Sequence, residues 1–161
     1  MTIDVFKFNQ RRNKFAIDAT LENNMLKEEG VEFFEATTTH ARLDAYIDFG
    51  YVLDGTKLKY LKHGLSFIES CPFKAWTNEL MGAMSDILIE EGVVREQVDA
   101  ADAIVCAINA LKGDKLDENG KVIKHATLPN ATDKIEEMLK VPINNVDGFT
   151  RAFLRDIYAT V

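Results

Sequence analysis

Apolar side chains recur every three or four positions along most of the chain, a spacing that places them on one face of an α-helix. Gly64, Gly92 and Gly113 directly follow three of these periodic stretches, as glycine commonly does where a helix ends. The pattern predicts helices over residues 3–12, 19–36, 40–63, 75–91, 95–112, 131–140 and 146–159. Alternation of polar and apolar residues is scarce, so we expect an all-α fold with little sheet.

The segment between the fifth and sixth predicted helices is different, because turn-forming residues interrupt it. Asp117-Glu118-Asn119-Gly120 predicts a tight turn that joins two short extended pieces, residues 115–116 and 121–123. We therefore expect a bundle of four to five helices over residues 1–125, with this short hairpin near its end.

The remaining residues, 126–161, are predicted to form a helical tail packed on the same domain. Asn130 has a side chain suited to capping the N-terminus of the first tail helix. In the second tail helix, Phe149, Phe153 and Ile157 form an apolar stripe that we expect to dock on the bundle.

Composition narrows the classes of function. The 161 residues suit a single domain. Lys and Arg number 19 against 26 Asp and Glu, a formal charge of −7, which argues against nucleic-acid binding because phosphate backbones require a cationic surface. The longest apolar run, residues 103–108, is too short for a membrane span. Residues 1–7 lack a secretory pattern, and Cys71 and Cys106 suit a reducing compartment, so we expect a cytoplasmic protein.

Acidic residues in the second predicted helix fall on its apolar side. At about 100° per residue, Glu29 and Glu32 lie inside the arc that apolar residues such as Leu26 and Phe33 define, and Glu28 lies at its edge. A solvated acidic face would lie opposite the apolar stripe instead. These glutamates are therefore predicted to point inward.

The third predicted helix repeats this arrangement. Asp44 and Asp48, four residues apart, share a face with Tyr51 and with Gly55, which allows a neighbour to approach closely. Two carboxylates ~5.5 Å apart repel by about 3 kcal/mol at an effective dielectric of ~20, and burying either one unpaired is costly. Four or five inward carboxylates therefore predict bound cations, and a set of oxygen ligands favours Mg²⁺, with Mn²⁺ also possible.

Three other interpretations of these carboxylates compete with a magnesium site. The acids are surface residues if the helical phase is shifted by one position. A di-iron bundle requires Glu-x-x-His pairs, but Thr37, Tyr60 and Val122 stand three positions before the histidines. A calcium loop over residues 114–120 lacks the required spacing because Leu116 occupies its third position.

Two segments carry a resemblance to a known family. Glu28-Glu29-Gly30-Val31-Glu32-Phe33-Phe34-Glu35-Ala36, followed by Leu43-Asp44-Ala45-Tyr46-Ile47-Asp48, resembles the all-α nucleoside triphosphate pyrophosphohydrolases. This superfamily includes MazG, dimeric dUTPase and phosphoribosyl-ATP pyrophosphohydrolase, and the similarity is closest to MazG-like members often encoded by phages. It covers roughly residues 4–125. The resemblance implies that Glu29, Glu32, Asp44 and Asp48 hold Mg²⁺, while Glu28 adds a ligand or orients the attacking water.

The chain departs from the family pattern at one point. In the family, Glu-Glu-x-x-Glu is followed by Glu-x-x-Asp, whereas Ala41 and Ala45 stand three positions before the two aspartates here. One carboxylate is therefore missing, and Asp44 and Asp48 would substitute for it at a spacing of four.

Residues 108–113 and 118–124 are also similar to the family. The resemblance implies that Asn109 and Lys112, on the inward stripe of the fifth predicted helix, approach the nucleotide. It implies the same for Lys121 and Lys124. Lys112 would neutralise phosphate charge during the reaction, although an inward lysine in an acidic bundle can equally be a structural counter-ion. Lys121 and Lys124 otherwise belong to an exposed charged turn. Asn13 resembles a substrate-pocket residue of the family or, alternatively, is a helix C-cap.

The resemblance implies a Mg²⁺-dependent hydrolase that converts a nucleoside or deoxynucleoside triphosphate to the monophosphate and pyrophosphate, as a homodimer or homotetramer. The alternative is a catalytically silent helical module that binds a nucleotide or a protein, and the missing glutamate favours it. A third possibility is a purely structural helical protein, in which the acidic residues are exposed to solvent.

Overall fold

The computed structural model describes residues 2–71, 74–118, 120–123 and 127–159, and it is all-helical apart from one short β-bridge. Its elements are α1 (Thr2–Arg11), α2 (Ala19–Glu35), α3 (Thr39–Lys62), α4 (Phe67–Ser70), α5 (Lys74–Glu90), α6 (Arg95–Leu111), α7 (Ala131–Leu139), the 3₁₀ helix η1 (Ile143–Asn145) and α8 (Val146–Tyr158). The expected all-α fold is confirmed, and each predicted helix begins and ends within one residue of an observed one. Only α4 and η1 were not predicted, because they are too short to show a periodic pattern.

Side chains and glycines set the ends of these helices. Asp18 caps α2 by accepting a hydrogen bond from the Leu21 amide at 3.0 Å, and Asn130 caps α7 as predicted by accepting from the Asp133 amide at 3.2 Å. After α3, Gly64 has a φ of +71°, and the amides of Gly64 and Leu65 bond back to the last turn at 3.0 and 2.8 Å. These paired bonds form a Schellman motif, which requires a left-handed residue that glycine supplies at little cost.

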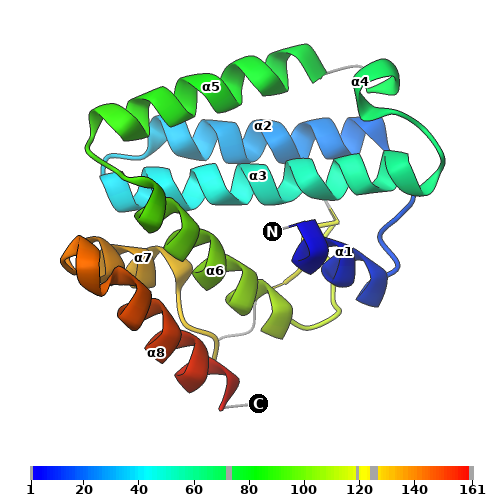
Figure 1. The fold of residues 1–161 in the computed structure, drawn as a ribbon. Coiled ribbons are helices and arrows are strands. Elements are labelled where there is room, and N and C mark those ends of the chain that lie inside the picture. Colours follow the sequence, from blue (N-terminus) through cyan, green and yellow to red (C-terminus); the bar gives the residue numbers. More distant parts are fainter. Residues whose placement is uncertain (1, 72–73, 119, 124–126, 160–161) are drawn as a thin grey trace.

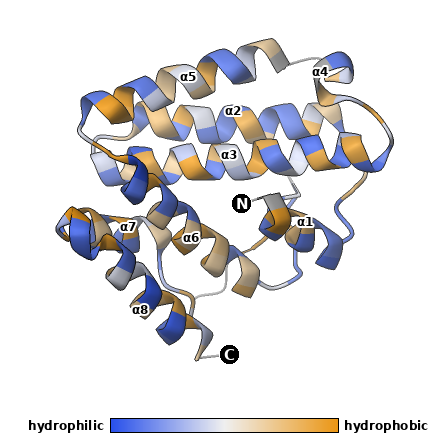
Figure 2. Ribbon diagram, viewed as in Figure 1, coloured by the Kyte–Doolittle hydropathy of each residue, from blue (hydrophilic) through white to orange (hydrophobic). Residues whose placement is uncertain are grey.

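The long helices lie in two groups. Helices α2, α3 and α5 run side by side across one part of the molecule, while α6 and α8 cross beneath them, and α7 packs against α3 and α6 (Figure 1). Both hydrophilic and hydrophobic residues occur along the length of α2 and α3 (Figure 2).

One apolar core joins the bundle and the tail. Its members are fully or almost fully buried and come from both parts of the chain, including Leu26, Phe33, Leu43, Phe49, Met84, Ile104, Ile135, Met138, Val146 and Ile157. Phe149 and Phe153 pack against this core from α8, so the predicted apolar stripe of the tail does dock on the bundle.

The predicted hairpin after α6 is present and folds back onto α2. An antiparallel bridge joins Leu116 and Val122, and the Ile123 amide bonds to the Lys115 carbonyl at 2.9 Å. Gly120 has a φ of +72°, and a β-carbon at this position would lie 3.0 Å from Leu21 Cδ2 of α2. The left-handed backbone and this close contact both favour glycine where the hairpin meets α2.

Within the described parts of the chain, no helix is both long enough and apolar enough to cross a lipid bilayer.

Candidate functional site

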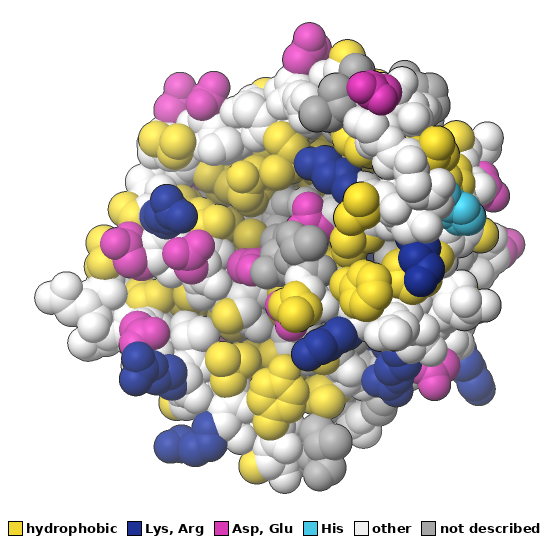
Figure 3. Space-filling model, turned by 45° about the vertical axis from the view of Figure 1, so that its right-hand side comes forward, with side chains coloured by type: hydrophobic (Ala, Val, Ile, Leu, Met, Phe, Trp, Pro, Cys, Tyr) yellow, Lys and Arg dark blue, Asp and Glu magenta, His cyan; other side chains and the backbone are white. Residues whose placement is uncertain are grey.

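A pocket opens between α1, α2, α3, the end of α6 and the hairpin. Its empty space, including the open mouth, is about 730 Å³. Charged and polar side chains of three kinds line it: the carboxylates Glu22, Glu29 and Asp48, the lysines Lys14, Lys59, Lys112 and Lys121, and the amides Asn9 and Asn109. The remaining walls are mostly apolar. Figure 3 shows a face of the molecule on which acidic, basic and hydrophobic side chains lie next to one another.

Two of the predicted metal ligands lie in this pocket. Glu29 of α2 is 3% exposed, and its Oε2 atom is buried without a hydrogen-bond partner among the described residues. Burial raises the pKa of the Glu29 carboxyl to about 7, against the opposing charge of Lys121. Although part of Asp48 reaches the pocket surface, burial and the charges of Asp44 and Glu29 raise its pKa well above the ordinary value. The ionised form of both carboxyl groups is therefore unfavourable in this pocket, and the nearby lysines do not fully offset the cost of burial.

Lys121 brings the hairpin to the acidic side of the pocket. Its Nζ lies 3.0 Å from Glu29 Oε1 and 3.3 Å from Glu28 Oε1. Burial alone would lower the pKa of Lys121, but the Glu29 carboxylate raises it above the usual lysine value. The hairpin turn holds this lysine in place, because the Lys121 amide donates to Asp117 Oδ1 at 2.9 Å. In this structure the Lys121 ammonium therefore partly neutralises the glutamates of α2.

A second group of cations approaches from α1 and α6. Arg12 donates to the carbonyl oxygens of Lys112 and Gly113 at 2.6 and 3.0 Å, which joins α1 to the end of α6. Lys14 is half-buried, and burial together with the nearby charges of Lys59 and Arg12 lowers its pKa to about 8. Among the described residues no carboxylate lies within ion-pair distance of Lys14, so an anionic ligand would find an uncompensated cation here.

An ion pair that the sequence pattern did not predict also lines the pocket. Glu22 is 1% exposed, and its Oε1 lies 3.1 Å from Lys59 Nζ. A signal for both residues was present in the sequence: Glu22 lies seven residues before Glu29, and Lys59 lies eleven after Asp48, so each pair shares a helix face. Asn9 of α1 also lines the pocket and donates to the Gly55 carbonyl at 3.4 Å.

The structure therefore brings together five of the predicted site residues, Glu29, Asp48, Asn109, Lys112 and Lys121. Asn109 is 5% exposed at the end of α6, and Lys112 directly follows that helix.

The other predicted residues lie outside the pocket lining. Glu28 reaches its edge through Lys121, but both Glu28 and Glu32 are exposed. Asn13 is also exposed and has a φ of +52° two residues after the end of α1, which agrees with the alternative role in ending this helix. Lys124 lies outside the described residues.

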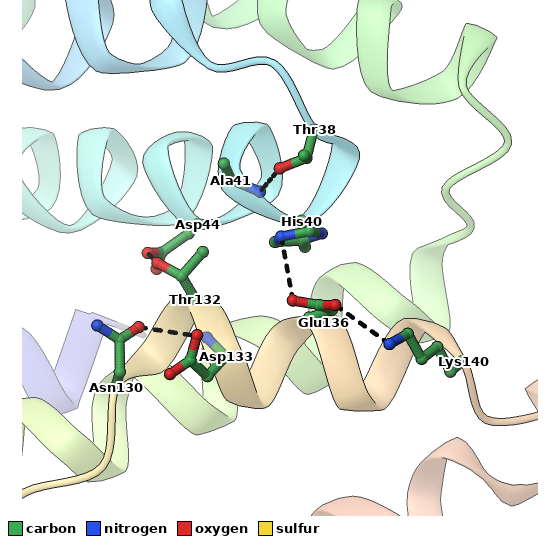
Figure 4. Close-up of polar contacts among 9 residues, drawn as sticks. All are labelled: Thr38, His40, Ala41, Asp44, Asn130, Thr132, Asp133, Glu136 and Lys140. Carbon is green, nitrogen blue, oxygen red and sulfur yellow. Dashed lines mark hydrogen bonds and ion pairs between the residues drawn. The ribbon is translucent and has the colours of Figure 1, made fainter.

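Asp44 faces the tail. Its carboxylate accepts a hydrogen bond from the Thr132 hydroxyl at the start of α7 (Figure 4). One turn further along α7, Oε2 of Glu136 lies 3.3 Å from His40 Nε2 of α3. A cation site that used Asp44 would have to form beside this contact between α3 and α7.

The carboxylates do not form a closed metal centre. In the described ranges no three His, Cys, Asp or Glu side chains are close enough together to hold a metal ion. Glu29 and Asp48 could each supply oxygen ligands from the pocket wall, and Glu28 and Glu32 lie on the same helix as Glu29.

Comparisons of the chain with known protein families, with curated proteins and with solved structures find no match.

Proposed function

We propose that the protein is a Mg²⁺-dependent nucleoside triphosphate pyrophosphohydrolase. One observation carries the proposal: a single pocket contains two carboxyl groups with raised pKa values, Glu29 and Asp48, beside three lysines, Lys14, Lys112 and Lys121. A divalent cation would stabilise the ionised form of these buried carboxyls, and clustered lysines attract an anion. A metal–polyphosphate complex has both charges, so it suits this pocket better than a free cation or a free anion would.

The donor chemistry fits Mg²⁺, with Mn²⁺ as a possible substitute. Glu29 has a buried oxygen with no partner among the described residues, and Asp48 is held in the same pocket by α3. We assign these two residues as the principal ligands and Glu28 and Glu32 as candidates for the remaining positions. When bound, Mg²⁺ would lower the pKa of a coordinated water and neutralise phosphate charge.

The proposed reaction transfers the nucleotidyl group of the substrate to water. A bond forms between the water oxygen and the α-phosphorus, and the bond from the α-phosphorus to the oxygen shared with the β-phosphorus breaks. Pyrophosphate leaves, and the proton of the water is released to solvent. Lys112 and Lys121 would hold the phosphate oxygens and balance the negative charge that develops on the leaving group. Glu28, at the edge of the pocket, would orient the attacking water.

Local positive charge matters because the chain as a whole is acidic, with a formal charge of −7. That net charge repels an anionic substrate at long range. Lys14, Lys112 and Lys121 would compensate for it at the site.

A homodimer or homotetramer remains part of the proposal. The exposed apolar side chains of Val31 and Phe34 on α2 would be available to such an interface.

The second candidate function is a nucleotide-binding module without hydrolysis. The position of Lys121 favours it, because this lysine already partly neutralises Glu28 and Glu29. The contact of Asp44 with Thr132 favours it as well, because it holds one predicted ligand away from the pocket. The two candidates differ in whether Mg²⁺ displaces Lys121 and leads to turnover.

Pyrophosphate release tests the proposal. Canonical nucleoside and deoxynucleoside triphosphates are incubated with Mg²⁺ or Mn²⁺, and pyrophosphate is measured for the wild type, Glu29→Ala and the control Glu35→Ala, an exposed residue at the end of α2. We expect release with the wild type and Glu35→Ala, and none with Glu29→Ala or with EDTA. No release from any nucleotide, with nucleotide binding retained, would favour the binding module.

A further inference from the structure

Glu22 and Lys59 line the pocket as an ion pair that the proposed chemistry does not use. Glu22 and Glu29 are seven residues apart on α2, which places them about 10 Å apart along the helix axis. Glu22 therefore lies too far along the pocket to act at the same phosphorus as Glu29. The separation is comparable with that between the α-phosphorus of a nucleotide and the far edge of its base.

Glu22 is incompletely satisfied although it is almost fully buried. Its Oε1 atom lies 3.1 Å from Lys59 Nζ and 3.3 Å from the Asp18 amide nitrogen. Its Oε2 atom is buried and has no hydrogen-bond partner among the described residues. Because an unpaired buried oxygen is unfavourable, this atom would gain most from a ligand that donates an N–H group.

Lys59 offers the complementary chemistry. Its side chain is 10% exposed, and its ammonium group has three donor hydrogens, of which Glu22 engages one. The pair therefore presents an acceptor beside a donor in the pocket. Adjacent ring atoms on the edge of a nucleobase present the same two functions in the opposite sense, an N–H group beside a carbonyl oxygen or a ring nitrogen.

Aromatic and aliphatic side chains of the same pocket offer apolar contact to a flat ring. Phe8 and Tyr51 line the pocket in an edge-to-face arrangement with centroids 5.5 Å apart. Gly55 adds no side chain to the wall, and its carbonyl is already bonded to Asn9. A heterocycle can bury its faces against such walls while its polar edge meets Glu22 and Lys59.

We propose that Glu22 and Lys59 form a subsite that reads the hydrogen-bonding edge of a nucleobase. Glu22 Oε2 accepts a bond from an N–H group of the base, and Lys59 donates to the neighbouring acceptor. This inference rests on the proposed function and deepens it, because it assigns the residues that decide which base is accepted. Base discrimination then comes from a pair of side chains separate from those that hold the phosphates and the metal.

Binding of deoxynucleoside monophosphates in EDTA tests the subsite without hydrolysis. Calorimetry is run with dCMP, dUMP, dAMP and dGMP, and with inorganic tripolyphosphate as a ligand that has no base. The variants are Glu22→Gln, Lys59→Gln and the control Glu35→Gln. Glu22→Gln keeps the shape of the side chain but replaces an acceptor-only group by one that also donates.

We expect the wild type to prefer one member of the dCMP–dUMP pair by about tenfold or more, since a site built to hydrogen-bond one edge rejects another. Glu22→Gln should shift that ratio by about tenfold towards the other base, and should change tripolyphosphate binding by less than about twofold. Lys59→Gln, the second variant, should also move the ratio, and Glu35→Gln should not.

Equal affinities for all four monophosphates, no binding of any of them, or an unchanged ratio in both variants would overturn the inference. So would a parallel loss of every ligand, tripolyphosphate included, because that is the result of a purely structural ion pair. Selective binding without pyrophosphate release would leave the subsite standing and overturn the hydrolase. Pyrophosphate release with an unchanged base ratio would overturn only the subsite.

Discussion

The ammonium group of Lys121 lies 3.0 Å from Glu29 Oε1, although the two residues are 92 positions apart in the sequence. The hairpin thus delivers a positive charge to a carboxylate whose pKa burial has raised to about 7. A divalent cation entering the pocket has to compete with this lysine for Glu29. Under the proposed function, the affinity for Mg²⁺ would therefore depend on a residue that is not itself a ligand.

Lys121→Met should make the metal-free protein less stable and more responsive to Mg²⁺. Loss of the ammonium leaves Glu29 buried without its partner, and we expect the free energy of unfolding at pH 8 to fall by about 1–2 kcal/mol, a modest value because Lys121 is partly exposed to solvent. Thermal melts in EDTA and in Mg²⁺ measure both effects. Mg²⁺ should raise the melting temperature of the variant more than that of the wild type.

Lys115→Met is the matched control, because Lys115 lies on the same hairpin with an exposed side chain. It should melt like the wild type under both conditions. The same response to Mg²⁺ in Lys121→Met and Lys115→Met would show that Lys121 does not compete for the metal site.

The raised pKa of Glu29 makes the stability of the metal-free protein depend on pH. A carboxyl whose pKa is higher in the folded than in the unfolded state favours folding below its unfolded pKa, near 4.5, and this contribution is lost as the pH rises through about 7. In EDTA, the wild type should therefore lose about 2–3 kcal/mol relative to Glu29→Gln between pH 5 and pH 8. Chemical denaturation at several pH values measures this difference.

Glu35→Gln, at an exposed position of the same helix, controls for the loss of one titrating carboxyl. If the difference between the wild type and Glu29→Gln does not change with pH, Glu29 ionises in the folded protein as it does in the unfolded chain.

The sequence predicted the helices well and the site only in part. Periodicity and caps are local signals, which explains why α2 and α3 begin and end so close to the predicted residues. The inward position of Glu29 and Asp48 also follows from helical phase, because both share a face with apolar neighbours. Glu32 shares the same arc but is exposed, since the phase of a helix does not reveal how far a neighbouring element extends over its face.

The residues that were missed depend on contacts between distant segments. The Glu22–Lys59 pair arises from the antiparallel packing of α2 on α3. The helical pattern shows which face of each helix is buried, but it does not show which residues of the two helices lie opposite one another. The environment of Lys14 depends on how α1 and the end of α6 meet through Arg12. Asp44 could not be assigned to the tail from the sequence, because nothing in the local pattern indicates that Thr132 lies beside it.

Binding of a polyphosphate should be accompanied by proton uptake near pH 8. The pKa of Lys14 is lowered to about 8 by burial and by neighbouring cations, so a fraction of this lysine is neutral at that pH. A phosphate group placed beside it favours the charged form and raises its pKa. Calorimetric titration with tripolyphosphate in buffers of different ionisation enthalpy measures the protons taken up.

Lys14→Met should abolish most of this uptake and weaken tripolyphosphate binding by about tenfold, as expected for loss of one charge-assisted contact. Lys7→Met, an exposed residue of α1, serves as the control. Because the pKa of Lys14 is depressed, its contribution to folding is fully present above the unfolded value near 10.5 and is lost as the pH falls through about 8. Uptake that persists in Lys14→Met would have to come from another group.

The bond between Thr132 and Asp44 should stabilise the docked tail and leave metal binding unaffected. Thr132→Val keeps the shape of the side chain but removes the hydroxyl that donates to the Asp44 carboxylate, so we expect the free energy of unfolding to fall by about 1–2 kcal/mol. Thr132→Ser, which keeps the donor, should lose less. Denaturation in EDTA measures the stability, and the shift of the melting temperature on adding Mg²⁺ measures the metal response, which should equal that of the wild type. A larger Mg²⁺ shift in Thr132→Val than in Thr132→Ser would show instead that Asp44 is a metal ligand that Thr132 holds away from the pocket.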